Sequence, residues 1–293
     1  MTASPVAGGN VLAGMVWMAA AGIQFNILNA FMRGIAIDLG GFEAQFLRYS
    51  AGFIVMLPLI LRTGLLRWRP HSLRGQAWRG VVHTAGLLLW FWALPHVPLA
   101  ELTAIGFTGP LFIMAGAALF LGEKVIAARW IAAIVGALGV AIVVGPGLGT
   151  GGGFWALVML ASTPLFGASF LITKALTRYD RPEVIVIWQA ITVSILTLPF
   201  AIPGWTWPAA TQWSIVLVAG ILGSSGHYCL TQAFRIADIS ATQPIKFLDL
   251  LWASLLGFAI FGDVPTIPTL IGAAITFAAT WWLARVEARR MRQ

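Results

Sequence analysis

Long apolar runs with almost no charge are the feature of this sequence that most restricts its fold. Residues 11–31 and 130–145 are two examples, and neither contains Asp, Glu, Lys or Arg. Such runs approach the roughly 20 residues that a helix needs to cross a bilayer. Strands of a membrane barrel would instead alternate apolar and polar residues in pieces of about 10, and no such alternation is seen. The runs predict a helical membrane protein with several spans.

Composition and terminal sequence agree with this interpretation. Of the 293 residues, 59% are hydrophobic and 10% are charged, whereas soluble domains are about 25% charged. Cys229 is the single cysteine, so an intramolecular disulfide is excluded. No Lys or Arg precedes Arg33, which argues against a cleaved signal peptide with a basic start. We therefore interpret the first apolar run as a retained span.

Gly, Pro and charged clusters divide the chain into ten predicted spans of roughly 20 residues. The loops between them are too short for a soluble domain. The sequence therefore predicts an all-α membrane protein with ten transmembrane helices. The predicted limits are 10–31, 43–62, 77–95, 100–121, 126–145, 153–174, 183–202, 211–233, 239–261 and 266–286.

Basic residues gather on one side of the predicted spans, and Arg33 is the only one in the opposite loops. Because Lys and Arg flank the cytoplasmic ends of spans, we expect a multi-pass inner-membrane protein with both termini in the cytoplasm. The net charge of +8 then reflects orientation in the lipid bilayer, and no nucleic acid partner is expected. The residues on the positive side are Arg62, Arg67, Arg69, Arg74, Arg79, Lys124, Arg129, Lys174, Arg178, Arg181, Arg235, Arg285, Arg289, Arg290 and Arg292.

A shift of about 140 positions aligns the first half of the chain with the second. Each half would contain five spans, an odd number, so the second half would be inverted in the membrane. We therefore expect residues 1–145 and 153–293 to form two inverted five-helix repeats around a central cavity. The matched positions are Glu43 with Glu183, Gly86 with Gly226, Ala93 with Ala233, Gly122–Glu123 with Gly262–Asp263, and the small-residue pair Ala132 and Gly136 with Gly272 and Thr276.

The two five-span halves and one motif resemble the drug/metabolite transporter superfamily, specifically the EamA-type bacterial exporters. The motif is an apolar helix with a proline followed by Leu-Gly-Glu, and it occupies residues 108–124. The second copy, 248–264, departs from it, with Asp249–Leu250 in place of Gly109–Pro110 and Asp263 in place of Glu. The resemblance implies an exporter or exchanger of amino acids, other metabolites or drugs, with aromatic amino-acid exporters as the nearest relatives. It implies no enzyme and no cofactor.

Two charged residues in the apolar segment 242–262 are the first candidates for a substrate site. Lys246 and Asp249 would each cost about 2.5–3.5 kcal/mol in hydrocarbon, and their i,i+3 spacing places them on one helical face with Thr242 and Gln243. Three interpretations stay open. The two charges pair with each other, or Lys246 reaches toward the cytoplasm while Asp249 bonds to another helix, or both line a wet cavity and meet the substrate.

Other polar and aromatic residues fall at similar predicted depths on other spans. The two histidines among them either hydrogen-bond between helices or contact substrate. Pro164 either kinks its helix or frees backbone carbonyls for a substrate ammonium. Arg48 either reaches the outer surface or guides substrate. The predicted site residues are Lys246, Asp249, His83, His227, Tyr228, Trp17, Trp90, Gln24, Thr163 and Gln243.

These residue types favour a zwitterionic substrate. Its carboxylate would face Lys246, its ammonium would face Asp249, and indoles would supply stacking surface. The sequence therefore predicts a secondary transporter that exports amino acids, aromatic ones included, or similar metabolites by alternating access. A multidrug efflux carrier for cations is the alternative; a metal enzyme is disfavoured because no HExxH spacing occurs. Proton coupling and facilitated diffusion both stay open, and we expect a monomer or a weak homodimer.

Overall fold

The computed structural model describes residues 11–97, 105–144, 153–256, 258, 259, 264 and 266–290, and these residues contain helices and no β-strand. This confirms the prediction of an all-α membrane protein. Within the described residues, six helices are long and apolar enough to cross a membrane. They are α1 (Val11–Leu39), α2 (Gly41–Thr63), α7 (Gly153–Leu176), α8 (Pro182–Ala201), α9 (Ala210–Ile236) and α12 (Ile267–Arg290).

The other helices do not establish the predicted count of ten spans. α3 (Leu73–Ala93) follows the short 3₁₀ turn η1 (Leu65–Trp68) and continues into η2 (Leu94–His96), while α5 (Gly109–Phe120) and α6 (Ala127–Val144) are shorter. The fourth span was expected to begin at residue 100, but residues 98–104, Glu101 included, lie outside the described residues. Pro110 stands in the first turn of α5, where its missing N–H has no helical partner to lose.

The ninth predicted span is not the continuous helix that we expected. It is divided into α10 (Ile239–Thr242), the 3₁₀ segment η4 (Gln243–Leu248) and α11 (Asp249–Leu256). Pro244 stands at the start of η4, where its fixed φ suits the first turn and its missing N–H disturbs a continuous α-helical ladder. A 3₁₀ turn in the middle of a helical segment often marks a hinge. The break thus lies next to the two charged residues of this segment.

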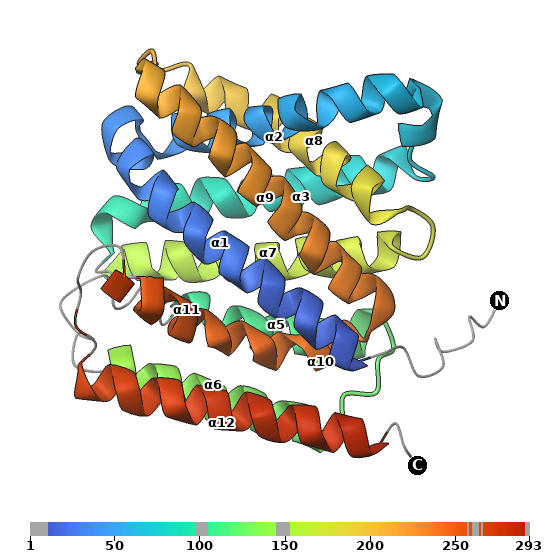
Figure 1. The fold of residues 1–293 in the computed structure, drawn as a ribbon, viewed down its shortest axis with the longest axis vertical. Helices are drawn as coiled ribbons and strands as arrows, with labels where there is room; N and C mark the ends of the chain where they lie inside the picture. The colour runs from blue at the N-terminus through green and yellow to red at the C-terminus, as the bar shows by residue number, and fades with distance from the viewer. Residues whose placement is uncertain are drawn as a thin grey trace.

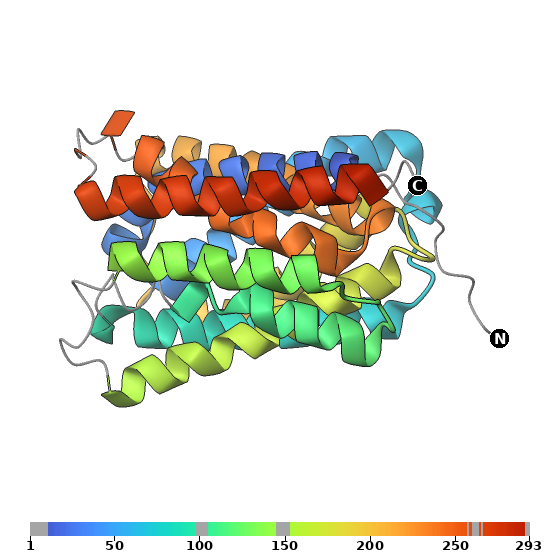
Figure 2. The same ribbon diagram turned by 90° about the horizontal axis from the view of Figure 1, so that it is seen from below.

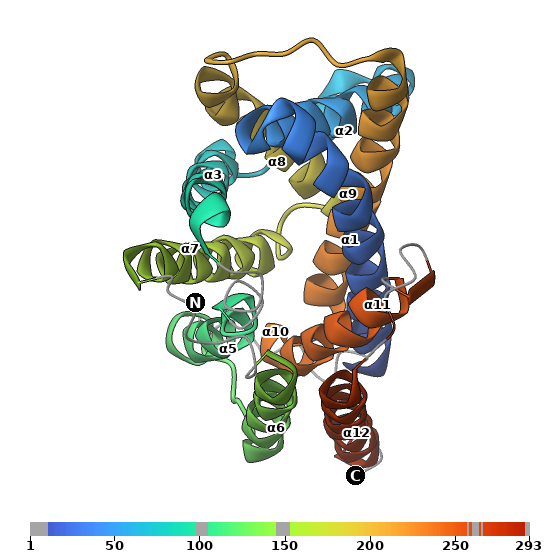
Figure 3. The ribbon, with the colours of Figure 1, turned by 90° about the vertical axis from the view of Figure 1, so that its left-hand side faces the viewer.

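Helices of the first half pack mainly against helices of the second half. α1 packs along α9 just as α3 packs along α7, while α2 packs on α8 and α6 packs on α12. Figure 3 shows α6 and α12 at one end of the long axis and α2 with α8 toward the other. α6 and α12 also lie side by side in Figure 2. The first turn of α1 and the last turn of α12 lie on the same side of the molecule (Figure 1); that this side is cytoplasmic stays a prediction.

Glycines allow the closest helix crossings, and two of these crossings are related by the 140-residue offset. A Cβ atom on Gly80 of α3 would lie 2.3 Å from the hydroxyl of Thr192 in α8. A Cβ atom on Gly220 of α9 would lie 2.7 Å from the backbone nitrogen of Gly52 in α2. Positions 80 and 220, and positions 52 and 192, differ by the same offset. Equivalent helices therefore cross in equivalent ways.

The crossing of α6 and α12 also depends on small residues, although not on all of those expected. A Cβ atom on Gly272 would lie 2.4 Å from the carbonyl oxygen of Gly139. Thr276 lies at the same crossing, but Gly136 faces Phe247 of η4 instead. Small residues at such crossings let helix backbones approach closely in the membrane.

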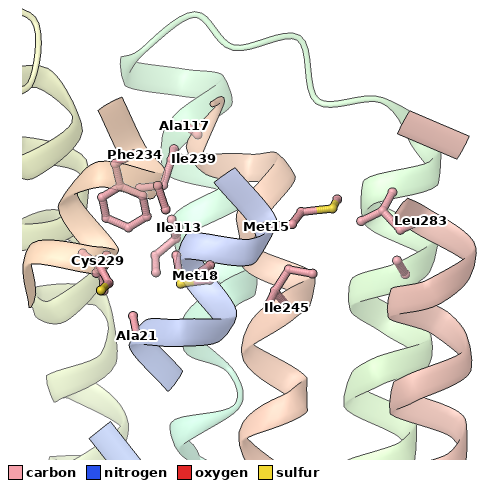
Figure 4. Packing of buried hydrophobic residues seen from close by; sticks show 13 residues of the cluster. Met15, Met18, Ala21, Ile113, Ala117, Cys229, Phe234, Ile239, Ile245 and Leu283 are labelled. Carbon is pink, nitrogen blue, oxygen red and sulfur yellow. The ribbon is translucent and has the colours of Figure 1, made fainter. Parts of the chain in front are cut away.

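The largest apolar cluster of the described residues is shared by seven helical segments (Figure 4). Met18 of α1, Ile113 of α5 and Phe234 of α9 are each at most 4% exposed. Ile245 of η4 and Leu283 of α12 belong to the same cluster. Close packing of this kind holds membrane helices together where burial from water gives little driving force. The cluster fixes the broken segment against α1 and thereby positions the charged residues beside it.

Candidate functional site

Two buried histidines from equivalent helices meet in the interior of the protein. The rings of His83 in α3 and His227 in α9 lie 5.9 Å apart, centroid to centroid. Nε2 of His83 is 2.9 Å from the hydroxyl of Tyr49, and its Nδ1 is 3.2 Å from the hydroxyl of Ser169. His227 is 6% exposed, and neither of its ring nitrogens has a hydrogen-bond partner in the described part of the chain. The structure thus brings the two predicted residues together. Both ring nitrogens of His83 have hydrogen-bond partners, whereas those of His227 do not.

Aromatic rings surround this histidine pair. His227 packs edge-on against Phe25 with a centroid distance of 4.9 Å, and His83 packs against Phe166 at 5.4 Å. Tyr49 lies 6.2 Å from each histidine ring. The centre of the protein therefore offers flat apolar faces beside hydrogen-bonding nitrogens, a combination that suits an aromatic heterocycle.

Arg79 is the main residue of this region that the sequence analysis misassigned. It was expected in a positively charged loop, but it lies inside α3 and is fully buried. Its guanidinium donates to the Thr173 hydroxyl at 2.5 Å, the Ile185 carbonyl at 3.0 Å and Oε1 of Gln189 at 2.7 Å. A planar guanidinium can reach several acceptors at once, so Arg79 joins the first half to α7 and α8 of the second.

A small cavity lies between α2, α8 and α9, next to the histidine pair. It has about 10 Å³ of free space for the centre of a water molecule, which is room for about one such molecule. Its polar lining was largely missed by the sequence analysis, because Gln189 and Tyr49 have no motif around them. The lining residues are Arg48, Tyr49, Gly52, Val186, Gln189, Ala190, Gly223, Ser224 and His227.

Lys246 and Asp249 form an ion pair with a Nζ–Oδ2 distance of 2.6 Å. Their side chains are 27% and 21% exposed. The ammonium lies 5.9 Å from the ring centre of Phe25, and the carboxylate faces Gly22 of α1, where an added Cβ would clash with it. The first of the three interpretations, mutual pairing, therefore describes the geometry of these two residues.

Three other predicted residues lie where α1 packs on α9. The amide of Gln24 donates to Sγ of Cys229 at 3.2 Å and accepts from the hydroxyl of Ser225. Trp17 packs edge-on against Tyr228 at a centroid distance of 6.1 Å. These side chains are half-buried, and they link α1 of the first half to α9 of the second.

The remaining predicted residues lie apart from the histidine pair. Trp90 reaches it only through Phe166, whose ring centroid is 6.3 Å away. The Thr163 hydroxyl donates to the carbonyl of Leu160 at 2.7 Å, which is the carbonyl that Pro164 leaves without its usual helical N–H. The Gln243 amide donates to the Ile239 carbonyl at 3.1 Å. The Thr163 hydroxyl thus bonds within α7, and the Gln243 amide of η4 bonds back to α10.

A second charged cluster joins α6, α10 and α12. Arg129 was expected in a loop, but it lies in α6 and is 4% exposed. It pairs with Glu287 at 2.8 Å and with Asp238 at 3.0 Å. Glu123, which ends the Leu-Gly-Glu motif, accepts hydrogen bonds from the first two backbone N–H groups of α10. A carboxylate is favourable at a helix N-terminus, so the motif connects the first half to the broken segment.

Comparison with known proteins gives this geometry a context. Residues 12–145 and 153–285 both match the EamA-like transporter family. The chain belongs to this family. The resemblance predicted from the sequence is therefore confirmed, and the protein is a small-molecule transporter and not an enzyme.

Several relatives of this EamA-like transporter align over nearly their whole length. A riboflavin transporter from Rhizobium johnstonii is 35% identical over 283 residues, covering 96% of this chain and 93% of that protein. A riboflavin transporter from Vibrio cholerae is 30% identical over 298 residues, covering 96% of each. An S-adenosylmethionine uptake transporter from Rickettsia prowazekii is 26% identical over 280 residues, covering 96% of this chain and 95% of that protein.

A crystal structure with 18% sequence identity shares the fold. It superposes with a TM-score of 0.82 and covers 96% of this chain and 99% of the other. The membrane helices and the transporter relatives together support a multi-pass inner-membrane protein. Among the residues that the structure describes, no three His, Cys, Asp or Glu side chains lie close enough to hold a metal ion. Monomer or weak homodimer stays a prediction.

Proposed function

We propose that this protein transports riboflavin across the inner membrane. One observation carries the proposal: two riboflavin transporters are 35% and 30% identical to this chain over 96% of its length. In this proposal residues 1–145 and 153–293 are inverted repeats whose termini lie in the cytoplasm. Their relative motion exposes a central site to each side in turn.

The chemistry of the central region supports this substrate. Riboflavin is neutral, and it joins a planar ring system with carbonyl and ring-nitrogen acceptors to a chain of hydroxyl groups. Phe25, Phe166 and Tyr49 offer ring faces on which such a system can stack. The ring nitrogens of His227 and Nε2 of Gln189 are buried without hydrogen-bond partners among the described residues. A neutral aromatic heterocycle could stack on these rings and hydrogen-bond to these polar groups without bringing an additional charge.

The small size of the cavity indicates that the halves must move during transport. Sites for ligands of this kind usually occupy about 300–1,000 Å³, far more than room for one water molecule. The 3₁₀ segment η4 contacts α1, α5, α6 and α12, so a hinge there would shift several helices together. In our proposal the described arrangement is the closed one, and substrate enters when α1 and η4 separate.

Reconstituted vesicles test the proposal directly. Proteoliposomes containing the purified protein are expected to take up radiolabelled riboflavin with saturable kinetics, whereas empty liposomes are not. Excess unlabelled riboflavin should abolish uptake, and phenylalanine and S-adenosylmethionine should leave it intact. Uptake equal to that of empty liposomes, by a protein that elutes as a single folded species, would reject riboflavin as the substrate.

Amino-acid export, the function predicted from the sequence, stays the second candidate because of one feature. The Lys246–Asp249 pair is partly exposed, and a zwitterion could exchange partners with such a pair. The alternative predicted from the sequence, an efflux carrier for cations, would need only the carboxylate of Asp249. The relatives described as S-adenosylmethionine transporters handle a molecule with both a zwitterionic end and a sulfonium cation, so the pair deserves a separate test.

Replacing Lys246 separates these candidates. If the substrate is an amino acid, Lys246→Ala should reduce its flux by about tenfold or more, because a hydrogen bond to a charged group contributes ~1.5–3 kcal/mol. Flux of a cation should persist or rise, and flux of riboflavin should change little. The double variant Lys246→Ala/Asp249→Ala controls for the unpaired carboxylate. Unchanged amino-acid flux in both variants would remove the main support for a zwitterion.

A further inference from the structure

Two arginines beside the small cavity, the fully buried Arg79 and the half-buried Arg48, have no carboxylate partner among the described residues. Arg79 bonds only to a hydroxyl, a backbone carbonyl and an amide, and Arg48 bonds to the amide oxygen of Gln45 at 3.1 Å. The ion pairs found in the described part of the chain involve Arg129 and Lys246 instead. Buried charges are normally compensated, since an isolated one costs several kcal/mol. The region therefore has an excess of positive charge.

The small cavity described above is lined by polar groups that have no hydrogen-bond partner among the described residues. Nε of Arg48, Nε2 of Gln189 and both ring nitrogens of His227 are buried without partners. Gln189 is 2% exposed and His227 is 6% exposed. Arg79 donates to Oε1 of Gln189, which leaves the NH₂ group of that amide as its free end. No carboxylate is among the residues that line the cavity.

We infer that this cavity binds one small inorganic anion of about the size of chloride. The anion accepts hydrogen bonds from Arg48, Gln189 and one N–H of His227, and its charge compensates Arg48 and the neighbouring Arg79. Space for about one water molecule excludes a larger ligand without movement. A water molecule would fit the space, but it would leave the two guanidinium charges uncompensated.

The anion would join the two halves of the transporter. Arg48 belongs to α2 of the first half, whereas Gln189 and His227 belong to α8 and α9 of the second. Arg48 also lies against Gly223, where an added Cβ would be 3.1 Å from its Nε. Bound at this point, the anion favours the closed arrangement. The inference does not depend on which substrate is carried.

Anion-dependent stability tests the site. Protein purified without halide is compared in sodium gluconate, chloride and bromide at constant ionic strength, with the unfolding temperature followed by tryptophan fluorescence. Chloride and bromide should raise that temperature in a saturable way, by roughly 5 °C or more at a hundredfold excess over Kd. A crystal grown in bromide should give an anomalous scattering peak in the cavity.

His227→Phe is the informative variant because it keeps a ring and removes nitrogens that have no protein partner. It should raise the halide concentration for half-maximal effect by about tenfold. Arg62→Gln, which changes an exposed arginine at the end of α2, should keep the wild-type response. An unfolding temperature that is the same in all three salts, or a bromide crystal without a peak there, would show an ordered water only and overturn the inference.

Discussion

Replacing Arg79 by methionine is expected to lower the free energy of unfolding by about 3 kcal/mol. Methionine nearly fills the space, but it leaves Thr173, Gln189 and the carbonyl of Ile185 without their donor. An unsatisfied buried polar group costs ~1–3 kcal/mol, and part of this cost is offset because a buried positive charge is removed as well. In detergent the unfolding temperature should fall by roughly 6 °C or more.

Two variants make this result specific. Arg74 lies in the first turn of the same helix and is exposed, so Arg74→Met should leave the unfolding temperature almost unchanged. Arg79→Lys keeps the charge but lacks the planar guanidinium that reaches three acceptors. Its unfolding temperature should lie between those of Arg79→Met and Arg74→Met. If Arg79→Met were as stable as the wild type, the three hydrogen bonds would only offset the free-energy cost of burying the guanidinium charge.

The fold class could be predicted because a bilayer leaves few solutions for an apolar chain. Helices satisfy every backbone group internally, so long charge-free runs were enough to predict α1, α7 and α9. The family also followed from the sequence, since five spans per half and the Leu-Gly-Glu motif resemble EamA-type exporters. The break at η4 did not follow. Pro244 stands at the break, but a proline alone does not distinguish a kink from a change to a 3₁₀ segment.

The candidate site was only partly accessible to sequence analysis. His83 and His227 were brought together by predicted depth, and the structure places their rings in contact. Arg79 and Arg129 were assigned to loops because a basic residue near a span end looks the same whether it flanks the membrane or turns inward. Gln189 stands in a predominantly apolar helix, and no motif surrounds it. Which way a side chain faces depends on packing between distant helices, and no local spacing records that.

Helix crossings give the second large expected effect, at Gly220. An added Cβ there would lie 2.7 Å from the backbone of both Ala51 and Gly52, and backbone atoms inside α2 cannot rotate away as a side chain can. Overpacking costs typically 1–3 kcal/mol. Gly220→Ala should fall at the upper end of that range, and Gly220→Leu should prevent formation of the folded protein. Yield of monodisperse protein in detergent and its unfolding temperature measure the effect.

Gly34 provides the matched control, because it is also a glycine inside a long helix. An added Cβ at Gly34 meets no atom within 4 Å. Alanine stabilises a helix interior by ~1 kcal/mol relative to glycine, so Gly34→Ala should leave the protein unchanged or slightly more stable. The same methyl group would then have opposite effects at the two positions. Equal tolerance at Gly34 and Gly220 would mean that α2 and α9 are not in close contact at this point, and the equivalence with the crossing at Gly80 would be lost with it.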